Sequence, residues 1–128
     1  MERVFYQILS DGQSAPVFPV MAPQDEDRPY ITYQTISSAP MNTLGGTSSG
    51  GDFEATVQVN IVCDSFIEAQ ERAAEVRSSL HGTRSLTSSP RLNMIHMTSE
   101  MTDEAAPAGG GERPIYRVLQ DYQVEFND

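Results

Sequence analysis

Apolar and polar side chains alternate along Asp52–Cys63, and this is the clearest pattern in the chain. The apolar positions are Phe53, Ala55, Val57, Val59, Ile61 and Cys63. Successive side chains of a strand point to opposite sides of a sheet, so the alternation predicts a long strand with one buried face.

The residues after this strand change to a helical period. Apolar side chains recur three or four positions apart, at Phe66, Ala69, Ala73, Val76 and Leu80. The spacing predicts an amphipathic helix from about 66 to 81. Ser65 and Glu68 fit a capping box at its start, and Gly82 is a stop signal at its end. Glu68 and Arg72 are spaced for a surface ion pair.

The same patterns predict the other elements. They are a short helix over 3–9 and strands over 17–21, 29–36, 91–101 and 115–126. The resulting order is α-β-β-β-α-β-β. We therefore expect an α+β fold, with a mostly antiparallel sheet and both the long helix and the short N-terminal helix packed on one face.

Two segments rich in small and polar residues, 37–52 and 103–113, separate predicted strands. We expect them to be long mobile loops that project from the sheet. A chain of 128 residues has the usual size of one domain, and such a domain buries roughly two thirds of its unfolded surface. We therefore expect a single domain over 1–128.

The formal net charge is −10, and all 8 basic residues are arginine. No stretch supplies the basic patch that binding to nucleic-acid phosphates or to an anionic membrane needs. The charge suits a surface past which DNA slides without sticking, but charge alone favours simple colloidal solubility as the explanation. The N-terminus lacks a signal-peptide pattern, and no stretch reaches the roughly 18 apolar residues of a membrane span. We expect a soluble, unsecreted protein.

No catalytic, metal or cofactor site follows from the sequence. The glycine-rich run 44–51 lacks the lysine and the following helix of a phosphate loop. His81 and His96 fall on different elements, and the acidic run 25–27 lacks the ligand spacing of a calcium loop. Cys63, on the apolar side of its strand, has the position of a buried structural thiol.

Three methionines flank His96. Regular strand alternation puts Met94 and His96 on one side of the sheet and Met97 and Met101 on the other. Because this divides the cluster, we expect packing rather than a soft-metal site.

Several segments of the chain follow one another in a recognisable order. They are VFYQILSD near the N-terminus, PYITYQ at 29–34, VNIVCD at 59–64, a helix with Glu-Ala and Ala-Ala that ends in Leu80-His81-Gly82, and the C-terminal IYRVLQDYQVEF. Together they extend from Val4 to Phe126. This combination resembles the small tail-completion or tail-terminator proteins of tailed bacteriophages and prophages.

The resemblance implies a structural role rather than an enzyme. Such proteins form rings, typically hexamers, that cap the head-proximal end of the tail tube, terminate tail polymerisation and join the tail to the neck. The implied partners are other copies of the chain, the tail tube protein and neck or connector proteins. Genomic DNA would pass through the lumen without specific binding, and no membrane or cofactor is implied. The implied location is the virion tail, after assembly in the host cytoplasm.

By analogy and from loop composition, we expect the partner contacts along the edge residues of the sheet and in the 37–52 and 103–113 loops. The residues that we expect to make them are Met41, Leu44, Asp52, Asp103, Glu104, Glu112 and Arg113.

Two alternatives stay open. The first is a head–tail connector or other neck ring protein. The second is a small dimeric α+β enzyme or ligand-binding module, which needs an apolar pocket with convergent polar groups between sheet and helix.

Overall fold

The computed structural model describes residues 1–13, 15–20, 29–40, 52–84, 91–105 and 115–127. In these ranges the chain forms helices α1 (Glu2–Asp11) and α2 (Phe66–Leu80) and strands β1 (Val17–Pro19), β2 (Tyr30–Pro40), β3 (Asp52–Cys63), β4 (Arg91–Ala105) and β5 (Ile115–Asn127). The predicted α+β order of elements is confirmed.

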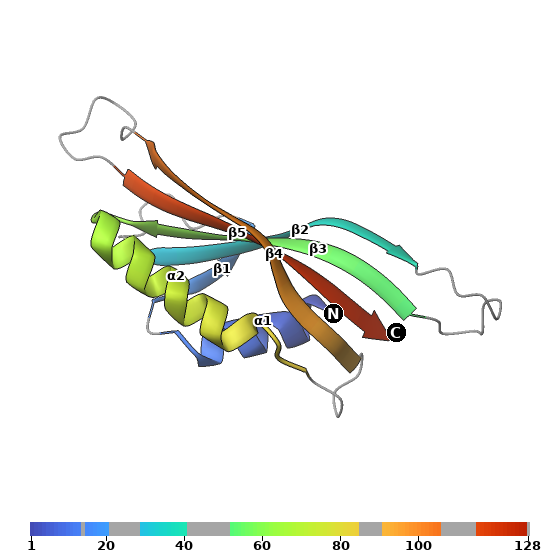
Figure 1. The fold of residues 1–128 in the computed structure, drawn as a ribbon. Helices are drawn as coiled ribbons and strands as arrows, with labels where there is room; N and C mark the ends of the chain where they lie inside the picture. Colours follow the sequence, from blue (N-terminus) through green and yellow to red (C-terminus); the bar gives the residue numbers. More distant parts are fainter. Residues whose placement is uncertain (14, 21–28, 41–51, 85–90, 106–114, 128) are drawn as a thin grey trace.

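The strands form one sheet in the order β1-β2-β3-β5-β4. The pairs β2–β3, β3–β5 and β5–β4 are antiparallel, as predicted for the long strands, and the short β1 runs parallel to β2. Along β3, Asp52 lies opposite Asn127 and Cys63 lies opposite Tyr116. The β2–β3 connection therefore leaves one end of the sheet and the β4–β5 connection leaves the other (Figure 1).

Both helices cover the same side of the sheet and close one hydrophobic core. The core takes Val4, Phe5 and Leu9 from α1, the alternating residues of β3, and the even-numbered residues of β5. On α2 the predicted stripe is buried from Ala69 to Leu80. Phe66, which we expected in that stripe, is instead 52% exposed. It lies in the first turn of α2, at the end of the sheet, where its ring makes an edge-to-face contact with the Tyr116 ring.

The boundaries of α2 follow its capping residues. Ser65 Oγ accepts the backbone N–H of Glu68 at 3.5 Å, which is one half of the predicted capping box. The Glu68 carboxylate accepts from Arg72 Nε at 3.2 Å, so the predicted ion pair is confirmed. Gly82 has φ of +80°, a conformation that side chains with a Cβ rarely adopt, and the chain turns there.

Two predicted loop boundaries are wrong. β2 continues through Ser37–Pro40, which pairs with Thr56–Phe53 of β3, and β4 continues through residues 103–105, which pair with residues 117–115 of β5. Backbone hydrogen bonds hold these extensions, and they need no apolar side chains. The remaining residues of the two expected loops, 41–51 and 106–113, lie outside the described residues.

The predicted position of Met101 is also wrong. The β4–β5 register shifts between Met97 and Ser99, which leaves Thr98 as an extra residue. Met97 pairs with Tyr122 on the helix side, as expected, but Met101 pairs with Leu119 on the other side, together with Met94 and His96. A bulge of one residue reverses the alternation beyond it, and no local sequence pattern predicted one.

Candidate assembly surfaces

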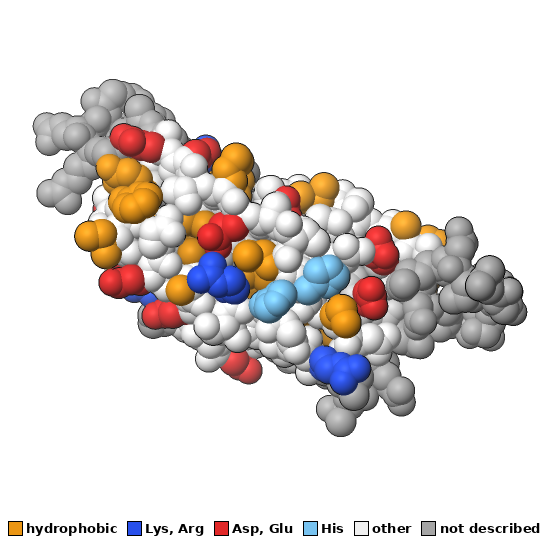
Figure 2. Space-filling view, viewed as in Figure 1, with side chains coloured by type: hydrophobic (Ala, Val, Ile, Leu, Met, Phe, Trp, Pro, Cys, Tyr) orange, Lys and Arg blue, Asp and Glu red, His pale blue; other side chains and the backbone are white. Residues whose placement is uncertain are grey.

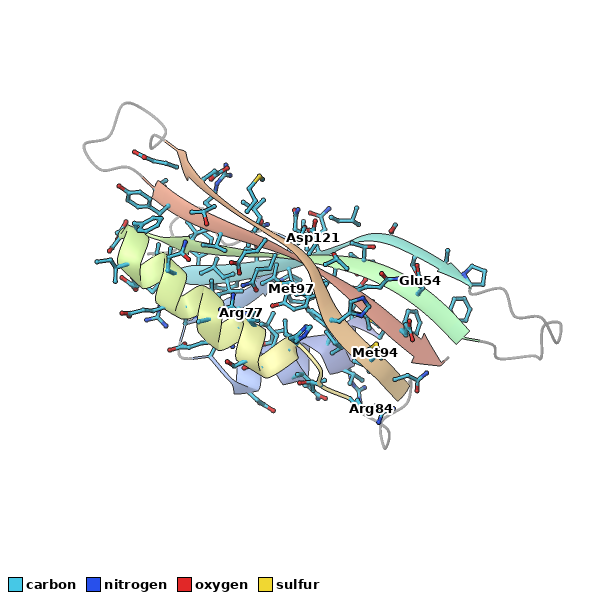
Figure 3. All side chains as sticks on the ribbon, in the orientation of Figure 1. Glu54, Arg77, Arg84, Met94, Met97 and Asp121 are labelled. Atoms are coloured by element: carbon cyan, nitrogen blue, oxygen red, sulfur yellow. The ribbon has the colours of Figure 1, made fainter. Side chains whose placement is uncertain are left out.

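The first half of β4 has its outer edge closed by the residues that follow α2. Three hydrogen bonds do this: Gly82 N–H donates to the Ile95 carbonyl at 2.7 Å, Met97 N–H donates to His81 Nδ1 at 3.0 Å, and Arg84 Nε donates to the Asn93 carbonyl at 3.1 Å. Figure 3 shows Arg84 beside the start of this strand. The bonds satisfy edge groups that would otherwise be open to another strand.

The second half of β4, Thr98–Ala105, has no strand against its outer edge among the described residues. We call it the free half of β4. Two of its side chains are fixed from α2: Arg77 Nη1 donates to Glu100 Oε2 at 3.0 Å, and Gln70 Nε2 donates to Thr102 Oγ1 at 3.1 Å. The side chains on this half are therefore partly ordered while its backbone edge stays open.

β2 at the opposite edge is divided in the same way. β1 pairs with Ile31–Tyr33, and Val20 N–H donates to the Tyr33 carbonyl at 2.8 Å. Beyond that point, Gln34–Pro40 has no outer partner in the part of the chain that the structure describes, and we call it the free half of β2. Ile36 lies at a register shift in this half and is 54% exposed.

The side of the sheet away from the helices, which we call the open face, carries polar side chains beside the apolar Val62, Met94, Met101 and Leu119. Asn60 Nδ2 donates to Thr32 Oγ1 at 3.3 Å. Asp121 accepts from Gln58 Nε2 at 3.2 Å and from Ser99 Oγ at 3.0 Å, so one carboxylate links three strands. Amide and hydroxyl groups on this face are thus satisfied by one another.

The arginine of the open face is paired with a carboxylate. Arg117 on β5 donates to Asp103 on β4 from Nε at 2.9 Å and from Nη2 at 2.7 Å. The hydrogen bonds from Arg117 lower the pKa of the Asp103 carboxyl, and those to Asp103 raise the pKa of Arg117. Among the side chains that the structure describes, the other charged ones on this face, Glu54, Asp121 and Glu125, are acidic.

On the helix-bearing side, the basic side chains are separated from one another by acidic and uncharged ones (Figure 2). Figure 3 shows one of them, Arg77, on α2 beside the sheet. Its guanidinium is held by Glu100. Neither described face therefore presents the clustered positive charge that phosphate binding requires.

The buried titratable groups are held in their neutral forms. Cys63 is fully buried, as expected, and burial, with a smaller effect of Glu68, raises the pKa of its thiol to about 11. Burial also raises the pKa of Tyr122, whose hydroxyl donates to Gln120 Oε1 at 2.6 Å. A neutral, enclosed thiol is a poor nucleophile and a poor metal ligand.

The described residues contain no group of three or more His, Cys, Asp or Glu side chains that could hold a metal ion. A hollow of about 510 Å³ runs along the outward side of α2 and is lined by Ser65, Ile67, Glu68, Glu71, Arg72 and Glu75. It lies on the surface, and the space between α2 and the sheet is filled by the core. Within the described residues, no helix is long and apolar enough to cross a membrane.

The predicted contact residues fall into two groups. Met41, Leu44, Glu112 and Arg113 lie outside the described residues. Asp52 is the first residue of β3, and Asp103 and Glu104 belong to β4 rather than to a loop. The register places Asp52 and Asp103 near opposite ends of the sheet, so the structure does not bring these residues together.

Contacts along the sheet edges were expected, but the sequence did not identify the two free strand halves. Their residues are mostly polar, and hydrophobic alternation is absent from them. A usable signal was the length of the neighbouring strands. The predicted strands over 53–63 and 115–126 are longer than the one over 29–36, so part of the central strand needed a partner.

A family model described as "Tail completion protein gp17" matches residues 8–123. The chain belongs to this family. Among solved structures, a chain from the "Virion of native gene transfer agent (GTA) particle" has the same fold, with a TM-score of 0.69 and 14% sequence identity, over 96% of this chain and 91% of that one. Among curated proteins, none matches the chain.

Family membership confirms the resemblance on which the functional expectation rested. This tail completion protein is a structural protein of a phage tail and is located in the virion tail. Its two half-closed sheet edges and its open face are the candidate surfaces for assembly.

Proposed function

We propose that this tail completion protein forms a homo-oligomeric ring, most simply a hexamer, on the head-proximal end of the tail tube. The ring ends tube polymerisation and joins the tail to the neck. Family membership carries this proposal, and the two unpaired strand halves support it, because a ring needs two different surfaces on each subunit.

The placement of the loop connections supports a bipolar role for the ring. The β2–β3 connection, with Met41 and Leu44, leads from one end of the sheet, and the β4–β5 connection, with Glu112 and Arg113, leads from the other. We propose that one connection contacts the tail tube protein and the other contacts neck or connector proteins. A single domain with contacts at both ends is sufficient for this task.

The charge supports passage of DNA through the ring without specific binding. The open face has satisfied amide and hydroxyl groups, carboxylates, and an arginine that is already paired with Asp103. With a net charge of −10, such a subunit repels phosphates. We propose that the open face lines the lumen.

The test is to measure the mass of the purified protein and to image it in negative stain, alone and with tail tubes. We expect particles with a central hole that sit on one end of a tube, and tubes that stop growing when the protein is added. A protein that ignores tube ends, or that binds only isolated portal or connector rings, would contradict the proposal and favour the neck alternative.

A further inference from the structure

We propose that neighbouring subunits join by strand pairing, with the free half of β4 in one copy adding to the free half of β2 in the next. This inference rests on the proposed ring. The partner is a second copy of this chain, and the contact extends the sheet from subunit to subunit with the helices on one side.

The strand directions favour this pairing. β2 is antiparallel to β3, β3 to β5 and β5 to β4, so β4 and β2 run in opposite directions at the two edges of the sheet. When a second copy is placed beside the first with its helices on the same side, β4 meets β2 in the antiparallel sense. Antiparallel strands need no crossover to pair.

Backbone groups on β4 are available for the pairing. The Ile95 carbonyl and the Met97 N–H point outward, since both bond to the segment that follows α2. In an antiparallel ladder, outward and inward residues alternate. Ile95 and Met97 pair with even-numbered residues of β5, and beyond the bulge Glu100, Thr102 and Glu104 do the same. The backbone groups of these three residues therefore also point outward.

The same reasoning applies to β2. Ile31 N–H and the Tyr33 carbonyl point outward, toward Pro16 and Val20. Past the register shift, Ser38 and Pro40 take the outward positions. Proline lacks an N–H, but because the backbone of Pro40 points outward, the missing group does not remove a hydrogen bond between β2 and β3. The neighbour's strand would end its pairing there.

The free halves lie at opposite ends of the sheet. The free half of β2 lies where β3 begins, and the free half of β4 lies where β3 ends. Each added copy would therefore be displaced along the strands. A sheet that closes on itself requires tilted strands and a stagger of this kind. β1 covers the other half of β2, and residues 81–84 cover the other half of β4. Two copies placed side by side without the displacement would bring a covered half against a free one, so they could not pair.

Charge favours this contact over a two-fold one. The free half of β4 carries Glu100, Asp103 and Glu104, whereas the free half of β2 carries no charged residue. Two β4 strands placed edge to edge would bring acidic side chains together, which destabilises a strand pair. Each free half also has one exposed aliphatic side chain, Ile36 at 54% and Met101 at 59%.

Engineered disulfides can test the pairing. The side chains of Ser37 and Met101 both face the open side, and their own backbone N–H and C=O groups point into their own sheet. When two such residues lie opposite each other in an antiparallel ladder, they form a non-hydrogen-bonded pair whose Cα atoms are about 4.5 Å apart. We would combine Ser37→Cys with Ser99→Cys, Met101→Cys or Asp103→Cys, which sample three registers. The native Cys63 is buried and stays in place.

We expect one double variant to give a ladder of covalent multimers up to the ring size after oxidation, with collapse to monomer on reduction. Each single variant should give no ladder. Rings seen in negative stain without a ladder from any of the three double variants would overturn this inference and leave the proposed ring intact. Dimers from a single Met101→Cys variant would indicate two-fold pairing and would also overturn it. Absence of rings under every condition would instead refute the proposed function.

A matched pair of substitutions gives an independent test. Met94 and Met101 are both exposed, both lie on β4 and both face the open side, but Met94 lies in the closed half of the strand. We expect Met101→Lys to reduce the fraction of protein in rings at least tenfold and Met94→Lys to leave it unchanged. Equal behaviour of the two variants, with unfolding curves like that of the wild type, would contradict the inference.

Discussion

The two faces of the sheet are built from the same strands and differ in what stabilises them. On β3, every side chain toward the helices from Ala55 to Cys63 is at most 1% exposed. The side chains between them are polar up to Asn60, and Gln58 and Asn60 bond to neighbouring strands. The covered face therefore carries the stability of the subunit, while the open face and the free strand halves are the candidate surfaces for assembly.

The largest contrast between the faces should be in thiol reactivity. At pH 8, a thiol with a pKa of about 11 is about 0.1% ionised, whereas an ordinary exposed cysteine is about one quarter ionised. We expect a disulfide reagent to label Cys63 at least two orders of magnitude more slowly than the new thiol of a Glu54→Cys variant, since Glu54 is exposed on the open face. Stopped-flow absorbance measures both rates. The two thiols should react at similar rates in denaturant. Similar labelling rates for Cys63 and for the thiol at position 54 in the native protein would refute a closed core.

Truncation of a core side chain should cost the next largest amount. Ile61 is fully buried in the central strand, between Ile31 and Val118. Ile61→Ala should lower the free energy of unfolding by about 2–5 kcal/mol, because it removes apolar contacts and leaves a cavity. The control is Thr56→Ala on the open face of the same strand, with a loss of no more than about 1 kcal/mol. Urea unfolding followed by circular dichroism gives both values, and similar losses would contradict the comparison.

Gln120 is the polar exception on the covered face. It is fully buried, and its Nε2 donates to the Ala73 carbonyl at 3.0 Å and to Glu100 Oε2 at 2.7 Å, while its Oε1 accepts from Tyr122. Gln120→Leu leaves the Tyr122 hydroxyl unpaired and should cost about 1–3 kcal/mol of unfolding free energy. Adding Tyr122→Phe removes that hydroxyl and should recover part of the loss. A double variant with the summed losses of the two single ones would show that the network is not coupled.

The sequence was sufficient to predict the covered face and not the edges. The alternation from Phe53 to Cys63 and the stripe from Ala69 to Leu80 reflect burial directly, so strand, helix and core were predicted correctly. Gln120 stood out as the one polar residue in the apolar series of the last strand, but its partners on α2 and β4 are distant in sequence.

The edges were harder because no burial marks them. Ser37–Pro40 and Thr102–Ala105 form strands through backbone pairing without an alternating apolar pattern, and the extra residue Thr98 moves Met101 to the open face. The candidate contacts were therefore attributed to loops and to edge residues that were not specified, while the unpaired residues of the described fold lie in the strands next to those loops. The bulge and the extensions depend on neighbouring strands, which local patterns do not include.

The smallest effect should come from the ion pair that crosses the open face. The pKa of Asp103 is lowered from its ordinary value of 3.8 by Arg117, so the pair stabilises the fold above that pH and loses its contribution as the pH falls through the folded pKa. Both side chains are substantially exposed, at 42% for Arg117 and 35% for Asp103. Asp103→Asn should therefore cost less than about 1 kcal/mol at pH 7 and nothing measurable near pH 2. Glu104→Gln removes the same charge next to this pair without touching it and is the control. Urea unfolding across pH 2–7 measures the difference, and a cost for Asp103→Asn that persists at pH 2 would mean that packing, rather than charge, holds β4 to β5 at this end of the sheet.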